Sequence, residues 1–422
     1  MMRPLLVWLH RYVGLAVTAF LVIAGLTGSA IAYYYPLDAA LNPQLYQAAP
    51  PAPQAAPLDP LELRARVEAQ LPEAWVHFAP LNIEPDRTVV YYVEGAVDPV
   101  TGDHRPIPAT EIFVNPYDGT IQGARLPGDL SQGIALNLMP FLYKLHHTLV
   151  IPGQAGSLIM GVAALLWLVD CFVGLALTLP RREVATGSAR NKAWIARWSK
   201  AWTVRWQRRL YPFSFNLHRA LSLWLWAVLL VFALSSVALN LPQVYRPALE
   251  SLFETRDHYA GDPPVANESA TPPIAWVRAR EIGASLAREQ ADIRGFTIVE
   301  PRTLIYDPHT ETFRYVFRSE RDIMQLYPST TVFFDGRTGA FKRLSLPTGQ
   351  YSGNTITQWL QALHYGDVFG GFYRAFVALL GCLIAIIAAT GVVIWWKKRR
   401  ARKARTATAV SSSLTGNLAP AE

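Results

Sequence analysis

The longest runs of apolar residues predict membrane-spanning helices. Four segments, at residues 12–35, 157–179, 220–241 and 375–396, are almost entirely apolar. A helix needs about 20 apolar residues to cross a hydrocarbon core of roughly 30 Å, so the pattern predicts an integral membrane protein with four transmembrane helices. The first segment resembles a signal peptide, but its apolar run exceeds the roughly 7–15 residues of such peptides, which favours a retained anchor.

Shorter patterns between these segments predict two mixed domains. Helical periodicity is followed by alternating, strand-like residues and then by a hairpin with an Asp-Gly or Thr-Gly turn. The helical patterns are at 59–71 and 275–290, the alternating stretches at 88–95 and 312–319, and the hairpins at 111–127 and 331–347. We therefore expect a small α+β domain, with a helix on an antiparallel sheet, in each half of the chain.

The two halves also repeat in the spacing of their histidines. His10 and His218 are 208 residues apart, and His146 and His364 are 218 residues apart, which predicts an internal duplication. The expected class is a mainly α membrane protein, a four-helix bundle with two α+β domains. The predicted order is transmembrane helix 1–35, domain 36–145, transmembrane helix 146–180, basic amphipathic loop 181–212, transmembrane helix 213–241, domain 242–358, transmembrane helix 359–397 and disordered basic tail 398–422.

Basic residues are concentrated beside the predicted helices. The connection 181–209 carries nine Lys and Arg against one acid, and the tail from Lys397 carries seven against one. Cytoplasmic loops carry such an excess, so we expect both termini and this connection in the cytoplasm, and the two α+β domains outside. The formal net charge of +8 therefore indicates membrane topology and not nucleic-acid binding. Trp194, Trp198, Trp202 and Trp206 recur every four residues, which predicts an interfacial amphipathic helix.

A leucine–histidine pair stands near the start of each apolar segment. The triplet Leu-His-Arg contains His10 and His218, and the other pairs contain His146 and His364. With the expected topology, His10 and His218 lie near the cytoplasmic face and His146 and His364 near the external face. Two inward-facing imidazoles at each level suit the axial positions of a b-type haem, so we predict two haems. Simple anchoring of the helices by interfacial histidines, or a bare metal ion, are the alternatives.

Several neighbouring residues are further candidates for a haem pocket. His147 is the second choice after His146, because adjacent helical residues point about 100° apart. Arg11 and Arg219 could pair with haem propionates or with lipid phosphates. Arg374, at the start of the last apolar segment, is a candidate because charges at that depth are usually functional. Asp170, inside the second apolar segment, could accept a hydrogen bond from the imidazole of His10 or His218, or serve a structural role.

The sequence lacks the motifs of other redox and hydrolytic chemistry. Its two cysteines, Cys171 and Cys382, form no CxxC or CxxCH motif, which argues against c-type haem and iron–sulfur clusters. No HExxH, GxSxG, P-loop or dinucleotide-binding pattern occurs, so we identify no catalytic side chain. Electrons would come from a separate cytoplasmic flavoprotein or from quinol.

These motifs, in this order, resemble the PepSY-associated transmembrane family. The resemblance rests on the Leu-His-Arg openings, on "LHHTLVIPG" (145–153) and "LHYGDVFGG" (363–371), and on the paired hairpins. The second of these sequences lacks the Pro-Gly of the first. Members of this family include siderophore-iron reductases of the bacterial inner membrane, with PepSY domains in the periplasm.

The resemblance implies a haem-dependent oxidoreductase that reduces ferric iron held by a siderophore in the periplasm and so releases ferrous iron. PepSY domains also occur in regulators of peptidases. The alternative function is therefore a non-enzymatic membrane protein that binds a peptidase or polypeptide. A third possibility is a subunit that passes electrons to another membrane enzyme.

Overall fold

The computed structural model describes residues 2–96, 104–180, 188–256, 262–265 and 269–416, except the side chains of residues 188–192, 405 and 407–416. The chain divides into two compact units. The helical unit contains Met1–Ala30, Leu145–Val244 and Ala375–Glu422, and the sheet unit contains Ile31–Lys144 and Tyr245–Arg374. Each unit therefore combines segments from both halves of the sequence.

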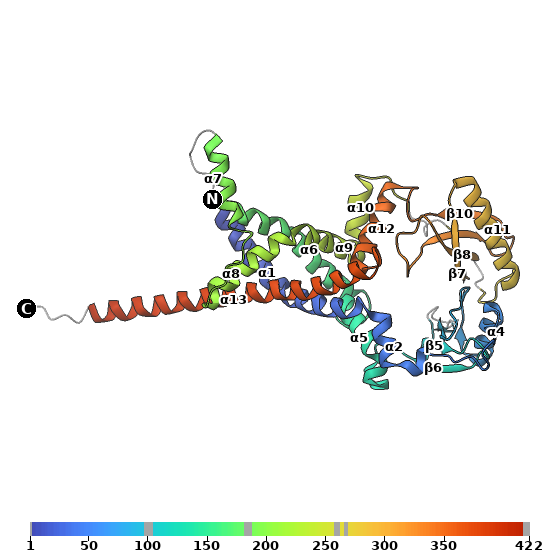
Figure 1. Ribbon diagram of the computed structural model, residues 1–422. Coiled ribbons are helices and arrows are strands. Elements are labelled where there is room, and N and C mark those ends of the chain that lie inside the picture. The colour runs from blue at the N-terminus through green and yellow to red at the C-terminus, as the bar shows by residue number, and fades with distance from the viewer. Residues whose placement is uncertain (1, 97–103, 181–187, 257–261, 266–268, 417–422) are drawn as a thin grey trace, which may run out of the picture. The chain divides into compact units, whose positions relative to one another are not determined.

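Apolar helices make up most of the helical unit (Figure 1). They are α1 (Met2–Ile31), α6 (Gln154–Thr178), α8 (Leu210–Trp224), α9 (Trp226–Asn240) and α13 (Gly370–Gly416), and the unit also contains the short basic helix α7 (Ser188–Ser199). Within the described residues, α1, α6 and Gly370–Ala404 of α13 are long and apolar enough to cross a membrane. The pair α8 and α9 gives a fourth span if it is counted as one helix. The chain is therefore a membrane protein with transmembrane helices.

The third predicted transmembrane helix is broken. Helices α8 and α9 meet at Leu225 with a bend of 72°. The neighbouring tryptophans donate hydrogen bonds in different directions: Nε1 of Trp224 to the carbonyl of Trp202, and Nε1 of Trp226 to the carbonyl of Cys171 on α6. These bonds tie the two sides of the break to different segments, which accounts for a bend without proline or glycine.

The connection after α6 packs back onto the helices. Nε1 of Trp194 donates to the carbonyl of Pro180, and Nε1 of Trp198 donates to Oγ1 of Thr178. The ring of Trp202 lies 5.3 Å from that of Trp224, whereas Trp206 is exposed. Trp206 also stacks on Phe213, with ring centroids 5.4 Å apart, but among the four regularly spaced tryptophans it has the high exposure expected of an interfacial anchor. At the other end of the unit's sequence, α13 continues to Gly416, through most of the tail that was expected to be disordered.

Helices α1 and α13 approach each other closely at two glycines. A methyl group on Gly25 would stand 2.5 Å from the carbonyl oxygen of Gly381. Beside this contact, the hydroxyl of Ser29 donates a 2.6 Å hydrogen bond to the carbonyl of Ala378. Small residues and a hydroxyl bond of this kind are the usual means by which membrane helices pack backbone to backbone.

The first half of the sheet unit contains short helices and two small sheets. Its helices are α2 (Tyr34–Leu41), α3 (Pro43–Tyr46), α4 (Pro60–Gln70), a 3₁₀ turn (Leu130–Gln132) and α5 (Ile134–Thr148). Its strands are β1 (Ala74–Trp75), β2 (Phe78–Pro80), β3 (Val89–Tyr92), β4 (Glu94–Gly95), β5 (Glu111–Val114) and β6 (Ile121–Arg125). Strands β3, β5 and β6 form an antiparallel sheet in the order β3-β5-β6, and β1 pairs with β4. Leu63 and Val67 of α4 pack on this sheet.

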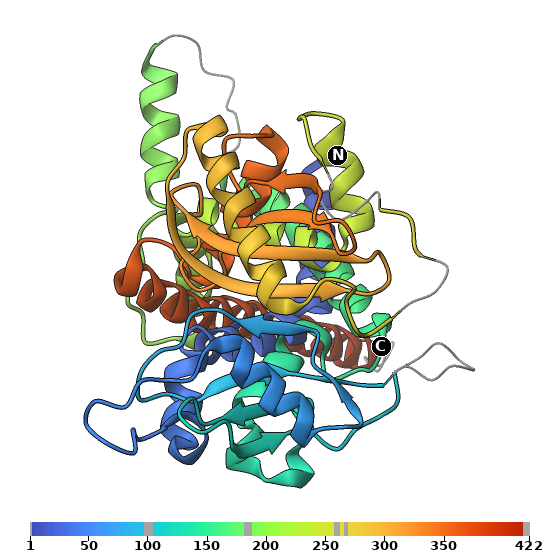
Figure 2. The same cartoon turned by 90° about the vertical axis from the view of Figure 1, so that its right-hand side faces the viewer.

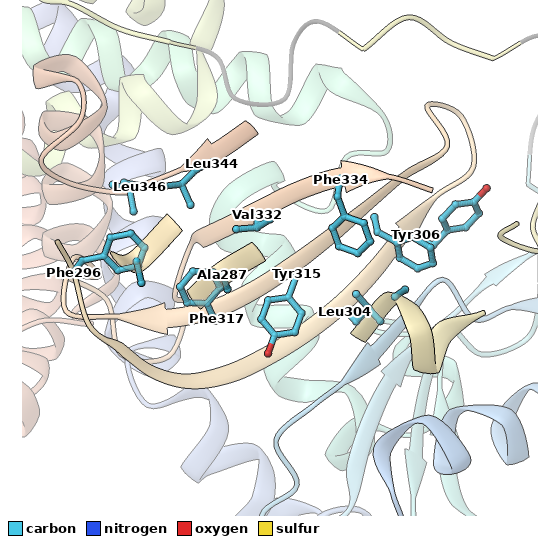
Figure 3. Packing of buried hydrophobic residues seen from close by; sticks show 13 residues of the cluster. Ala287, Phe296, Leu304, Tyr306, Tyr315, Phe317, Val332, Phe334, Leu344 and Leu346 are labelled. Atoms are coloured by element: carbon cyan, nitrogen blue, oxygen red, sulfur yellow. The ribbon is translucent and has the colours of Figure 1, made fainter. Parts of the chain in front are cut away.

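The second half of the sheet unit contains a larger sheet with one long helix. Its helices are α10 (Pro242–Glu250), α11 (Trp276–Arg294) and α12 (Ser352–Tyr365), and its strands are β7 (Ile298–Asp307), β8 (Thr312–Ser319), β9 (Thr330–Asp335) and β10 (Phe341–Ser345). In Figure 2 the helix α11 crosses the face of these strands. Figure 3 shows the core between them, where Phe317, Val332 and Phe334 lie near Ala287 of α11. The predicted helix, alternating strand and hairpin are present in both halves.

One strand departs from the expectation of two separate domains. Strand β2, from the first half, pairs antiparallel with β7 from the second, with Phe78 opposite Ile305 and Pro80 opposite Thr303. The five-stranded sheet therefore has the order β10-β9-β8-β7-β2. The two predicted α+β domains share a sheet, because the edge of β7 is completed by residues more than 200 positions earlier in the chain.

A buried ionic network lies where α2 and the small sheet meet. The guanidinium of Arg125 contacts the carboxylates of Asp38 and Glu111, at 2.6 and 2.5 Å. The hydroxyl of Tyr46 donates to Asp38 at 2.6 Å, and all four residues are buried. Such a network is costly to disrupt, because removal of one partner leaves a buried charge uncompensated.

Candidate functional site

Two of the four candidate histidines face each other in the helical unit. His10 lies on α1 and His218 on α8, and their ring centroids are 6.0 Å apart with 60° between the ring planes. The sequence spacing predicted this pairing, because both residues belong to a Leu-His-Arg triplet. The structure thus brings two imidazoles from distant parts of the chain to one position in the bundle.

The Nδ1 atom of each imidazole is held by a different kind of acceptor. Nδ1 of His10 lies 2.9 and 3.0 Å from the two carboxylate oxygens of Asp170 on α6. Nδ1 of His218 lies 2.9 Å from the carbonyl oxygen of Ile387 on α13, and 3.2 Å from the hydroxyl of Thr390. Carboxylates and carbonyls only accept hydrogen bonds, so both Nδ1 atoms carry the proton and Nε2 carries the lone pair. This is the tautomer of a histidine that ligates through Nε2.

Glycines lie against the rings of both histidines. A methyl group on Gly174 would stand 3.6 Å from Cε1 of His10, and one on Gly391 would stand 3.4 Å from Cε1 of His218. Gly14 leaves similar space beside Asp170, where a methyl group would be 3.8 Å from Oδ2. Each imidazole therefore packs against the backbone of a neighbouring helix, α6 for His10 and α13 for His218.

His146 sits in the same kind of backbone notch. Its Nδ1 lies 3.0 Å from the carbonyl oxygen of Ala24 and 3.1 Å from the hydroxyl of Thr27 on α1. A methyl group on Gly28 would stand 3.0 Å from its Cε1. The choice of His146 over the adjacent His147 as a ligand remains a prediction. His146 does not open the transmembrane helix as predicted. It ends α5, and α6 starts eight residues later, because Leu149 and Val150 adopt positive φ angles of 56° and 61°.

The notches for His146 and His218 share a sequence feature that the sequence analysis missed. Both consist of a backbone carbonyl followed three residues later by Thr-Gly, in "AGLTG" (24–28) and "IAATG" (387–391). The threonine hydroxyls also bond to the helix backbone, Thr27 to Ile23 and Thr390 to Ile387. Two Thr-Gly pairs inside apolar helices were the available signal.

His364 lies in the sheet unit, at the end of α12 and not at the start of α13 as predicted. Its ring is 6.2 Å from that of Tyr365, edge to face. Gly366, Phe369 and Gly370 all have positive φ angles, and they separate α12 from α13. The pairing of His364 with His146 remains a prediction.

The three candidate arginines have different surroundings. Arg219 donates to the carbonyl of Lys200 at 3.0 Å and to Oδ1 of Asn216 at 3.2 Å. Arg11 lines a cavity of about 460 Å³ together with Arg3, Trp8 and Arg402. Three arginines give this cavity a basic lining. Pairing of either arginine with a propionate remains a prediction.

Arg374 acts on a buried carboxyl group in the sheet unit. Burial raises the pKa of Asp367 above its usual value. The hydrogen bonds that its carboxyl group accepts from backbone N–H groups, and the charge of Arg374, lower the pKa but do not outweigh burial. Asp367 is 3% exposed and accepts a 2.8 Å hydrogen bond from the N–H of Leu326. Arg374, near the start of α13, is thus close enough for its charge to act on Asp367, and its place in a haem pocket remains a prediction.

The two imidazoles of His10 and His218 suit a metal ion whose other ligands are supplied by a cofactor. In the described part of the chain, no group of three or more His, Cys, Asp or Glu side chains could hold a metal ion. Metal–imidazole bonds of about 2 Å on both sides, with ring radii of about 1 Å, put two axial imidazole centroids about 6 Å apart. The observed 6.0 Å fits this arrangement. A haem supplies four equatorial nitrogens of its own, so two facing imidazoles are the ligands that it requires.

Apolar spanning helices combined with antiparallel sheets define the chain as a helical membrane protein with α+β domains. The family model for the PepSY-associated TM region matches residues 7–398, nearly the whole chain. The protein therefore belongs to the PepSY-associated transmembrane family, as its histidine and hairpin motifs predicted. No curated protein matches the chain.

Proposed function

We propose that this protein is a membrane oxidoreductase that binds two b-type haems. The facing imidazoles of His10 and His218 carry the proposal, because their 6.0 Å separation and Nδ1–H tautomers suit axial ligation. His146, in the last turn of α5, has the same tautomer, because its Nδ1 donates to the carbonyl of Ala24 on α1. His364 would be its partner. Bound haem would supply a one-electron ferric/ferrous couple. Two imidazoles on each iron leave no open coordination position, which favours electron transfer over oxygen binding.

The chain's own residues orient the ligands. Asp170 and the carbonyl of Ile387 hold the Nδ1–H groups of His10 and His218, so that Nε2 of each imidazole would be the atom that binds the iron of a haem. The helices around them are mainly apolar, which would suit a site that transfers electrons. His147, adjacent to His146, would form a hydrogen bond with a haem propionate.

The proposed location is the bacterial inner membrane, with both termini in the cytoplasm. The basic connection and tail support this orientation, and the two halves would be related by duplication. Electrons would pass from a cytoplasmic flavoprotein or from quinol to a ferric siderophore in the periplasm. Siderophores hold ferric iron far more tightly than ferrous iron, so one electron would release the metal.

The first test is haem content. We expect the detergent-purified full chain to show absorbance bands that shift on reduction with dithionite, and a pyridine haemochrome assay to give two haems per chain. Single variants His10→Ala, His218→Ala, His146→Ala and His364→Ala should each lose about one haem. His104→Ala is the control, because its side chain is 41% exposed and contacts Glu94 in the sheet unit. A folded, colourless protein would contradict the proposal and favour a binding function.

The second test is electron transfer across a membrane. Protein in lipid vesicles with a trapped reductant should reduce a ferric siderophore added outside, and a ferrous-specific dye would report the product. The His218→Ala variant should lose this activity, while His104→Ala keeps it. Vesicles that carry two haems per chain but release no ferrous iron would contradict the siderophore substrate and not the haem assignment.

A further inference from the structure

The two imidazoles of the His10–His218 pair have acceptors of unequal charge. His10 donates to a carboxylate, with both oxygens of Asp170 within 3.0 Å of Nδ1. His218 donates to a neutral carbonyl and lies beside a neutral hydroxyl. His146 also donates to a neutral carbonyl. Of these three Nδ1 hydrogen bonds, the one made by His10 has a carboxylate acceptor, and the other two have a backbone carbonyl as acceptor.

Asp170 is well placed to act electrostatically. It is 9% exposed, inside the apolar helix α6, where charges interact more strongly than in water. The space beside it is kept open by Gly14 of α1. A carboxylate that accepts Nδ1–H raises the basicity of the ring's other nitrogen, and a more basic imidazole binds ferric iron more strongly relative to ferrous iron.

We propose that Asp170 is a positioning residue that lowers the reduction potential of the metal site at His10 and His218 relative to the site at His146. The inference rests on the proposed haem function. The effect is specific to one site, because Asp170 contacts His10 whereas His146 is held by Ala24 and Thr27 of α1. The two sites would therefore have different potentials, with the site at His10 and His218 the lower.

The test is a redox titration of the full chain in detergent, followed by visible absorbance, with haem content measured in parallel. Wild-type protein should show two separate one-electron waves. In Asp170→Asn the amide oxygen still accepts from Nδ1 but the charge is lost, so the lower wave should move upward while the upper wave stays. We expect at least a tenfold change in the ferric-to-ferrous preference, which is about 59 mV for a one-electron couple.

Two further variants separate charge from geometry. Thr390→Val removes the neutral hydroxyl beside His218 and should move the lower wave less than Asp170→Asn does. Asp170→Glu keeps the charge and should keep the lower wave below the upper one. Asp170→Glu also decides the question if Asp170→Asn binds only one haem.

Specific outcomes would overturn the inference. In the wild type, the outcome is a single wave. In Asp170→Asn, it is an unmoved lower wave or equal movement of both waves. In the other variants, it is a shift in Thr390→Val as large as in Asp170→Asn, or loss of the wave separation in Asp170→Glu. A wild-type protein without haem would overturn the proposed function as well. Two bound haems with unmoved waves would overturn the role of Asp170 alone.

Discussion

Glycines beside the imidazole rings differ in whether a single added methyl group would fit. A methyl group on Gly28 would stand 3.0 Å from Cε1 of His146, whereas one on Gly174 would stand 3.6 Å from Cε1 of His10. Carbon atoms attract best at about 3.5–4.0 Å, so the first contact is repulsive and the second is ordinary packing. The two glycines therefore differ in how much substitution they tolerate.

This difference gives a paired prediction. We expect Gly28→Ala to displace the His146 ring and weaken haem retention at that site by about tenfold, a typical cost of disturbing the residues that support a ligand. Gly174→Ala should keep both haems. Haem per chain after detergent washing is the measurement, and equal retention in the two variants would contradict the role given to Gly28.

At the scale of elements, the buried network around Arg125 joins α2 to strands β5 and β6. We expect Arg125→Ala to destabilise the protein by about 3–5 kcal/mol, because Asp38 and Glu111 would remain buried without their cation. Arg278→Ala is the matched control. It removes an exposed pair with Glu281, which is worth about 1 kcal/mol or less. Denaturant unfolding followed by fluorescence would measure both, and similar losses would argue against the network.

Elements were predicted unequally well from the sequence. The helix, alternating strand and hairpin of each half carry clear periodicity and tight turns, and the structure confirms them. No proline or glycine in the sequence indicates the bend at Leu225. The bend depends on indole N–H hydrogen bonds to the carbonyls of Trp202 and Cys171. Strand β7 was missed because Glu300 and Pro301 interrupt its alternation and a register shift follows.

The candidate site shows the same division. Repeated Leu-His-Arg triplets predicted that His10 and His218 would pair, and the depth of Asp170 in an apolar helix suggested a role beside them. The backbone notches could not be predicted, because a carbonyl acceptor leaves no side-chain signal in the sequence. The positive φ angles of Leu149 and Val150 also could not be predicted from the sequence, since neither residue type favours them.

At the scale of the whole molecule, α4 and α11 are connected by an ion pair from different halves of the chain. Asp59 accepts a 2.7 Å hydrogen bond from Arg280 and also caps α4 through the N–H of Leu61. Partial burial raises the pKa of Asp59, but these hydrogen bonds outweigh it and lower the pKa below its usual value. The stabilisation is therefore present above the unfolded pKa of about 3.9 and is lost as the pH falls through the lower, folded value.

The pair predicts a pH-dependent difference between variants. Asp59→Asn should be less stable than wild type at pH 7, and the difference should shrink as the pH falls below about 4, where the wild-type carboxyl group also becomes neutral. Arg280→Gln should show the same trend. Melting temperatures measured across this pH range would decide, and a difference that does not change with pH would argue against the ion pair, because asparagine also caps helices.

The pairing of β2 with β7 has a consequence for any attempt to divide the chain. A fragment limited to residues 242–358 would expose the edge of a ten-residue strand that Phe78–Pro80 covers in the intact protein. Open edges of this kind recruit strands from other molecules, so the fragment would be expected to self-associate. Halves exchanged between related proteins would meet the same requirement, since each new first half must supply a strand that fits the old second half.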